Sequence, residues 1–255
     1  MNNLLVPIQA KSLKEVFIER FEAMILAGEI KAGQKLPSER ELAKMLNVSR
    51  PIVHEGLFEL GIRGLVTIKP RVGTVVNDYR TNGSLTILGT LLNHYSGTLE
   101  TKLLESMVEM HTLFETETVR LAAHNRTEKQ LQVFYQLLQE WEKTDISDVD
   151  ATTDIYFRFH HHIAMASGNL FYPLLLNSFK NFYINLTRQS FVDATIVPIL
   201  FAYHKKIVEG IARKNVAMAV KAMKDMIASG EKHLKQIIAR RTRERGVSSL
   251  PLQKK

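Results

Sequence analysis

The sequence of 255 residues contains no cysteine, and this absence removes several classes of protein at once. Disulfide-stapled folds, zinc ribbons and cysteine nucleophiles all need a thiol, so the sequence excludes them. A chain without cysteine is also typical of the reducing cytoplasm, which is where we expect this protein to act.

Long apolar runs are missing as well. No stretch of about 18 apolar residues occurs, so we expect no membrane-spanning helix. The amino terminus has a short apolar patch but no basic segment before it and no small-residue cleavage site, so we expect no signal peptide. The sequence also lacks a P-loop, a nucleophile elbow, an HExxH motif and a dinucleotide fingerprint, which favours a binding protein over an enzyme.

Positive charge is in excess, with a formal net charge of +8. Such an excess favours an anionic partner without specifying which one. Residues 1–80 hold twelve Lys/Arg against nine Asp/Glu, so this part of the chain has no broad basic surface. The positions of the basic residues are therefore more informative than their number.

The stretch Leu36–Val76 predicts a winged helix-turn-helix. Ser38 and Glu41 have the spacing of a capping box, which opens a short first helix. Asn47 and the residue after it form the turn, and Ser49 is expected to cap a second helix. An earlier helix is expected over 11–27.

The second helix has an inward and an outward face. Val53, Leu57 and Leu60 recur at helical spacing and are expected to face the core. Arg50 and His54 then point outward at the leading end of this helix. An exposed helix of this kind is the element that enters a DNA major groove.

Two β-rich runs, 65–69 and 74–77, flank a tip at Pro70–Gly73 and predict the wing. Lys69 and Arg71 place two positive charges at this tip, where they can reach a minor groove or flanking phosphates.

Two further basic residues, Arg40 and Arg50, open the two short helices. A helix N-terminus favours phosphate through its free amide protons, and an arginine there adds a charged contact or a bidentate bond to guanine. The pattern predicts binding to double-stranded DNA. Docking onto another protein is the alternative use of such a module.

Apolar periodicity after residue 84 is helical throughout, so we predict an antiparallel helical bundle. The fold class is therefore mainly α, a winged helix-turn-helix followed by an all-α bundle. Helices are expected at 85–95, 100–124, 127–143, 151–167, 171–191, 195–213 and 215–240. The predicted divisions are a DNA-binding domain at 1–78, a linker and connecting helix at 79–98, an effector-binding and dimerisation domain at 99–240, and a basic flexible tail at 241–255.

Three adjacent histidines, 160–162, suggest a metal cluster at first sight. Successive residues of a helix are turned by about 100°, so the three side chains point in different directions and cannot share one ion. His160 continues the apolar line of Phe157 and Ala164, and we interpret it as an inward core residue with a hydrogen-bond partner.

The segments LPSERELAKMLNVSR, GLVTI and GTVV resemble the amino-terminal domain of GntR-type bacterial transcription regulators over residues 10–77. The resemblance implies a homodimer on a palindromic operator. It also implies operator contacts from Arg40, Ser49, Arg50, Pro51, Ile52, His54, Lys69, Pro70, Arg71 and Gly73. His54 departs from the arginine that is usual in the family.

The second half resembles the helical domain of the FadR subfamily, through Phe159-His160, Ser167-Gly168-Asn169 and Tyr203-His204-Lys205. Many members bind a divalent metal with one Asp and three His. Those four ligand positions fall here on Tyr156, His160, His204 and Met226. Because Tyr and Met are poor ligands for such a cation, we expect no metal; a site on His160 and His204 alone is the alternative.

A pocket without metal resembles that of the acyl-CoA-responsive branch of this subfamily, which segments 82–91, 172–183, 201–205 and 229–231 also resemble. We therefore expect no cofactor and an acyl-CoA as the effector, ahead of a small carboxylate. The expected effector residues are His111, Tyr156, His160, His204, Met226, Ser229 and His233. His233 replaces an aromatic residue of that branch, and a helical domain that only dimerises is the remaining alternative.

Overall fold

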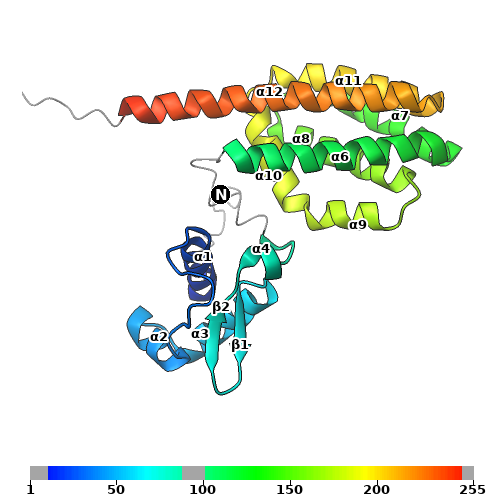
Figure 1. Ribbon diagram of the computed structural model, residues 1–255. Helices are drawn as coiled ribbons and strands as arrows, with labels where there is room; N and C mark the ends of the chain where they lie inside the picture. The colour runs from blue at the N-terminus through cyan, green and yellow to red at the C-terminus, as the bar shows by residue number, and fades with distance from the viewer. Residues whose placement is uncertain (1–10, 88–100, 249–255) are drawn as a thin grey trace, which may run out of the picture. The chain divides into compact units, whose positions relative to one another are not determined.

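The computed structural model describes residues 11–87 and 101–248 (Figure 1). The chain divides into two compact units, Met1–Leu99 and Glu100–Lys255. Within the described ranges almost every element is a helix, and one two-stranded sheet lies in the first unit. The predicted mainly α class is confirmed. None of the described helices is long and apolar enough to cross a membrane.

The first unit is a winged helix-turn-helix (Figure 1). Its elements are α1 (Leu13–Leu26), α2 (Glu39–Leu46), α3 (Arg50–Ile62), β1 (Val66–Lys69), β2 (Gly73–Val76) and α4 (Tyr79–Asn82). The capping box predicted at the start of α2 is present, since the Ser38 side chain accepts from the Glu41 amide. Between α2 and α3, Asn47 takes a left-handed conformation with φ 52° and turns the chain.

The start of α3 differs from the prediction in one detail. Ser49 occupies the N-cap position, but its side chain makes no capping hydrogen bond. An N-cap side chain normally accepts from the second or third residue of its helix; Pro51, the second, has no amide proton, and the amide of Ile52, the third, is not engaged by Ser49 either. The predicted cap at Ser49 is therefore wrong as a side-chain interaction.

The core of the first unit forms where α1 crosses α3. Val53, Leu57 and Leu60 are buried, as predicted. A Cβ atom placed on Gly56 would lie 2.3 Å from the ring of Phe17, so this glycine allows the two helices to approach closely.

The wing is an antiparallel pair in which Val66 lies opposite Val76. The preceding loop lies along the other edge of β2, where the Leu36 amide donates to the Thr74 carbonyl at 2.9 Å. The predicted linker and connecting helix at 79–98 begins with the short helix α4, whose first turn is capped by Asp78. The connecting helix expected over 85–95 lies outside the described residues from residue 88 onward.

The second unit is a bundle of seven described helices, in which α6, α11 and α12 lie side by side (Figure 1). Its helices are α6 (Thr101–Asn125), α7 (Glu128–Lys143), α8 (Val149–Ala166), α9 (Phe171–Ser178), α10 (Lys180–Phe191), α11 (Ile196–Ala212) and α12 (Val216–Ser248). The core is dense around α8, where Phe159 and Ile163 are fully buried. The guanidinium of Arg126 donates to the Ala212 carbonyl at 2.8 Å and so closes the end of α11.

Two helix boundaries in the bundle correct the sequence analysis. The single helix expected over 171–191 is broken at Phe179, where φ is −95° and ψ is 0°. A one-residue break leaves the apolar spacing almost unchanged, so the periodicity could not reveal it. The end of α12 lies at Ser248, although the flexible tail was expected from Arg241. The intervening run 241–248 contains three Arg and one Glu, residue types that favour helix.

Candidate functional site

The leading end of α3 is exposed to solvent. The side chains of Arg50 and His54 are 72% and 62% exposed, respectively, while Val53 between them is fully buried. The buried positions anchor the helix and leave its first two turns facing outward. This is the division of faces that the sequence predicted.

A carboxylate from α2 joins these two side chains. Glu39 Oε2 lies 3.2 Å from Arg50 Nε, and Glu39 Oε1 lies 2.7 Å from His54 Nδ1. The pKa of Glu39 is lowered, chiefly by its hydrogen bond with His54 and further by Arg50. Sequence reasoning missed Glu39 because eleven and fifteen residues separate it from its partners, and no local pattern links them.

The predicted basic residues lie at the tip of the wing, where the backbone includes positive φ angles. Arg71 has a φ of 61° and Gly73 a φ of 109°, so the hairpin turns within a few residues. Lys69 and Arg71 are exposed. Lys35 also lies against this tip, with its Cε atom 3.0 Å from a Cβ placed on Gly73. Lys35 is a third cation at the wing that the sequence analysis did not include.

The predicted DNA-contacting residues are almost all accessible. Ile52 is half-buried, and the other nine are exposed: Arg40, Ser49, Arg50, Pro51, His54, Lys69, Pro70, Arg71 and Gly73. The structure joins Arg50 and His54 through Glu39, and it places the wing residues at the hairpin tip.

The second unit contains a cavity of about 130 Å³ lined by residues of α6, α8, α9, α10, α11 and α12. Its walls are mostly apolar. They are formed by Met107, Val108, Met110, His111, Phe114, Tyr156, Leu176, Phe179, Tyr183, Leu186, Thr187, Ser190, Phe191, Leu200, Met226, Ile227, Gly230, Glu231 and Leu234. A concave, mostly apolar space with a few polar groups is the usual form of a small-molecule site.

Three of the predicted effector residues, His111, Tyr156 and Met226, line this cavity. Ser229 and His233 are not part of its lining, although their neighbours Gly230 and Leu234 are. The Nε2 atom of His233 lies 3.2 Å from the Ser190 carbonyl. The five cavity-lining residues of α10 were not among the predicted effector residues, because the resembling segment 172–183 covers only the start of that helix: Tyr183, Leu186, Thr187, Ser190 and Phe191.

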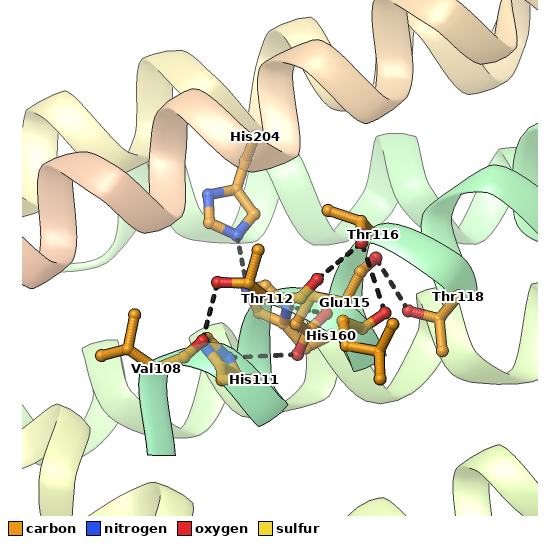
Figure 2. Close-up of polar contacts among 9 residues, drawn as sticks. Val108, His111, Thr112, Glu115, Thr116, Thr118, His160 and His204 are labelled. Atoms are coloured by element: carbon orange, nitrogen blue, oxygen red, sulfur yellow. Dashed lines mark hydrogen bonds and ion pairs between the residues drawn. The ribbon is translucent and has the colours of Figure 1, made fainter. Parts of the chain in front are cut away.

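The other two predicted residues, His160 and His204, lie together in a buried cluster (Figure 2). Their Nε2 atoms are 3.2 Å apart. His160 Nδ1 lies 2.8 Å from Glu115 Oε2, and His204 Nδ1 lies 2.7 Å from the Leu200 carbonyl. The ring of Tyr156, which lines the cavity, is centred 4.6 Å from the ring of His160.

The hydrogen-bond partners determine where the protons lie in this cluster. A carbonyl only accepts, so His204 carries its proton on Nδ1. Burial lowers the pKa of His204 well below its ordinary value, and the charge of His160 adds to this, so His204 is neutral and its Nε2 accepts. His160 therefore donates from Nε2.

The carboxylate of Glu115 completes the cluster. Burial alone would raise the pKa of Glu115, but the charge of His160, the hydrogen bond from His160 and the nearby His111 lower it to about 2. An ionised carboxylate only accepts, so His160 also donates from Nδ1 and is an imidazolium. Glu115 and His160 form a buried ion pair beside the cavity. His111 Nε2 stands 3.5 Å from the other Glu115 oxygen.

The interpretation of His160 as an inward residue with partners agrees with this geometry. His162 lies apart from it, with Nε2 2.8 Å from the Gln130 carbonyl. Within the part of the chain that the structure describes, no three His, Cys, Asp or Glu side chains form a group that could hold a metal ion. Glu115, a carboxylate on the inward face of α6, was the sign in the sequence that the inward His160 has a charged partner.

Comparison with known families divides the chain as the structure does. A family profile described as bacterial regulatory proteins of the gntR family matches residues 13–76. A second, the FadR C-terminal domain, matches residues 77–241.

Several regulators are similar to most of the chain. The transcriptional regulator LutR of Bacillus subtilis is 30% identical over 205 residues, which cover 78% of this chain and 91% of that protein. The fatty acid metabolism regulator protein of Proteus mirabilis is 30% identical over 178 residues, or 69% of this chain and 71% of that protein.

A solved structure of Lar, which controls expression of the Listeria monocytogenes agr system, has a similar fold. It aligns with a TM-score of 0.59 at 20% identity, over 90% of this chain and 99% of that one.

The buried ion pair predicts a specific dependence of stability on acid. Replacing Glu115→Gln removes the counter-charge of His160, and we expect a loss of about 3 to 5 kcal/mol at neutral pH. Because folding lowers the pKa of Glu115 from 4.5 to about 2, its contribution is complete above pH 4.5 and is lost as pH falls toward 2. Urea unfolding of wild type and variant at neutral pH and at pH 4 measures both effects.

The control for this prediction is Glu117→Gln on the same helix. Glu117 forms a half-exposed pair with Arg120, so its replacement should cost less than about 1 kcal/mol. Equal losses for the two variants, or an unchanged acid profile in Glu115→Gln, would contradict the buried pair.

Proposed function

The chain belongs to the GntR family of bacterial regulatory proteins and carries a FadR C-terminal domain, and from this membership we propose that it reads a palindromic operator as a cytoplasmic homodimer controlled by a small effector. It is a DNA-binding transcriptional regulator of this type. Beyond this, we propose which surface contacts DNA, that the protein is a dimer, and that an effector controls it.

The single observation that carries the proposal is the exposed leading end of α3. Its buried side holds the helix against α1, while Arg50 and His54 project from the first two turns. A major groove about 12 Å wide admits one α-helix, and an arginine at its leading end can form two hydrogen bonds to guanine. Two copies related by a two-fold axis would address two half-sites.

We assign the remaining contacts by position. Arg40 at the start of α2 faces the phosphate backbone, and the wing reaches a minor groove or flanking phosphates. The proposed contact residues are Arg40, Ser49, Arg50, Pro51, Ile52, His54, Lys69, Pro70, Arg71 and Gly73. Lys35 joins them because it lies against the wing tip.

The effector proposal rests on the cavity of the second unit. Its apolar walls suit an acyl chain, and a relative of this chain is named a fatty acid metabolism regulator. We therefore propose an acyl-CoA as the effector. Its binding controls DNA affinity only to the extent that it favours one arrangement of the dimer over another.

A small carboxylate is the second candidate, and the size of the cavity favours it. The space of about 130 Å³ is close to that of a cavity that holds a single benzene molecule, so a long acyl chain would have to enlarge it. His111 is the cavity-lining group suited to an anion. A metal is not proposed, because Tyr156 and Met226, at two of the four ligand positions that the family resemblance implies, are poor ligands for a divalent cation.

Arg50→Ala tests the reading surface. We expect a loss of about 1 to 3 kcal/mol in binding to a duplex that wild type selects from a randomised library, because a bidentate contact is lost. Fluorescence anisotropy at constant salt measures the affinity. Arg213→Ala is the control, since Arg213 is an exposed arginine of the second unit paired with Glu209. Equal effects of the two changes would contradict the assignment.

Thermal unfolding with added ligands tests the effector. We expect an acyl-CoA at 100 times its dissociation constant to stabilise the second unit by about 2.7 kcal/mol and to change the affinity for the selected duplex. Free fatty acids, small carboxylates and divalent metal salts are the comparison ligands.

Two variants of α10 locate the effector. Thr187→Trp fills the cavity and should abolish the shift, whereas Asn185→Trp places the same ring on an exposed position of that helix. A shift caused only by a carboxylate or a metal would replace the acyl-CoA. No shift with any ligand would leave the second unit as a dimerisation domain.

A further inference from the structure

One carboxylate holds two side chains of the proposed reading helix. Each oxygen of Glu39 takes one partner, Oε2 the Nε of Arg50 and Oε1 the Nδ1 of His54. Glu39 itself is only 24% exposed, whereas its two partners are largely exposed. The carboxylate therefore lies beneath the two side chains and can hold both while their outer atoms remain accessible.

The contact with Arg50 leaves its terminal atoms available. Only Nε is engaged with Glu39, so the two Nη groups project from a guanidinium plane whose inner edge is held. These Nη groups are sufficient for a bidentate contact with guanine or with one phosphate. Holding the inner edge in advance reduces the side-chain entropy that the contact would otherwise cost.

The contact with His54 determines its tautomer. An ionised carboxylate only accepts, so the proton of the neutral ring is on Nδ1 and the free Nε2 is an acceptor. When the ring takes up a second proton, Nε2 becomes a donor. Phosphate oxygens and the guanine O6 and N7 atoms accept hydrogen bonds, so only the protonated ring can donate to them from Nε2.

Protonation of His54 also makes the net charge at the leading end of α3 more favourable for DNA. With a neutral ring, Glu39 and Arg50 cancel and the leading end of α3 carries no net charge. With an imidazolium it carries +1, which a polyanion favours. On the neighbouring face, Nζ of Lys14 in α1 lies 3.7 Å from Oε2 of Glu55. These two charges neutralise each other, so they add no net charge beside His54.

We propose that Glu39 is a positioning residue for the reading helix and that it couples operator binding to the uptake of one proton by His54. The inference rests on the proposed function, since it assumes that α3 faces DNA. The protonated ring binds more tightly, so affinity is present at low pH and is lost as pH rises through the range in which histidines titrate.

The test is the affinity for the selected duplex as a function of pH. His54 is the only histidine between residues 11 and 87. Between about pH 5.5 and 8 we expect the wild-type affinity to fall with rising pH, approaching about tenfold per pH unit for each proton taken up. His54→Gln keeps a polar side chain without the titration, and its affinity should stay level over this range.

Glu39→Gln separates positioning from charge. The amide keeps the size of the side chain but removes the charge that faces Arg50 and His54, so we expect its pH profile to differ from that of wild type. His124→Gln, an exposed histidine of α6, is the matched control and should keep the wild-type profile.

The outcomes distinguish this inference from the proposed function. If wild type selects no sequence from the library, the proposed function fails. If it selects one but its affinity does not change with pH, or if His54→Gln keeps the wild-type slope, the proton coupling alone is overturned. An unchanged profile in Glu39→Gln overturns the role of that carboxylate.

Discussion

The division of α3 into a buried and an exposed side is the constraint on which the account depends. Val53, Leu57 and Leu60 are excluded from water against α1, and this burial holds the helix in one orientation. Only with that orientation can Arg50 and His54 point outward together. The close contact between Gly56 and Phe17 brings the two helices near enough for the anchors to pack.

The two units use ionised groups in different ways. In the first, Glu39 lies near the surface and its partners remain accessible, so their outer atoms can contact another molecule. In the second, Glu115 and His160 are enclosed, and their charges satisfy each other beside the cavity. Desolvation offsets much of the attraction within a buried pair of this kind, so removing one partner costs more than the whole pair contributes to net stability.

Local signals in the sequence were sufficient for the helix-turn-helix. The capping box at Ser38 and the spacing of Val53, Leu57 and Leu60 each depend on residues close in the chain, and both were predicted correctly. Both features also depend on local backbone geometry, which residues close in the sequence determine.

The features that the sequence did not reveal depend on contacts between distant residues or on small changes in the backbone. The joining of Glu39 to α3 spans fifteen residues, and the pairing of Glu115 with His160 spans forty-five. The break at Phe179 leaves the apolar pattern in place, and the Ser49 side chain makes no capping hydrogen bond although its residue type and position favour one. The cavity walls on α10 have no sequence motif, so only the packed bundle reveals them.

The absence of cysteine allows a direct measurement of where α3 lies on DNA. A single Pro51→Cys substitution, labelled with an iron chelate that generates hydroxyl radicals, should cleave the selected duplex within the major groove of each half-site. The same label at Asn185→Cys serves as the control. Cleavage confined to the half-site grooves from Pro51→Cys is the predicted result. No cleavage there, or the same pattern from both positions, would contradict a reading role for α3.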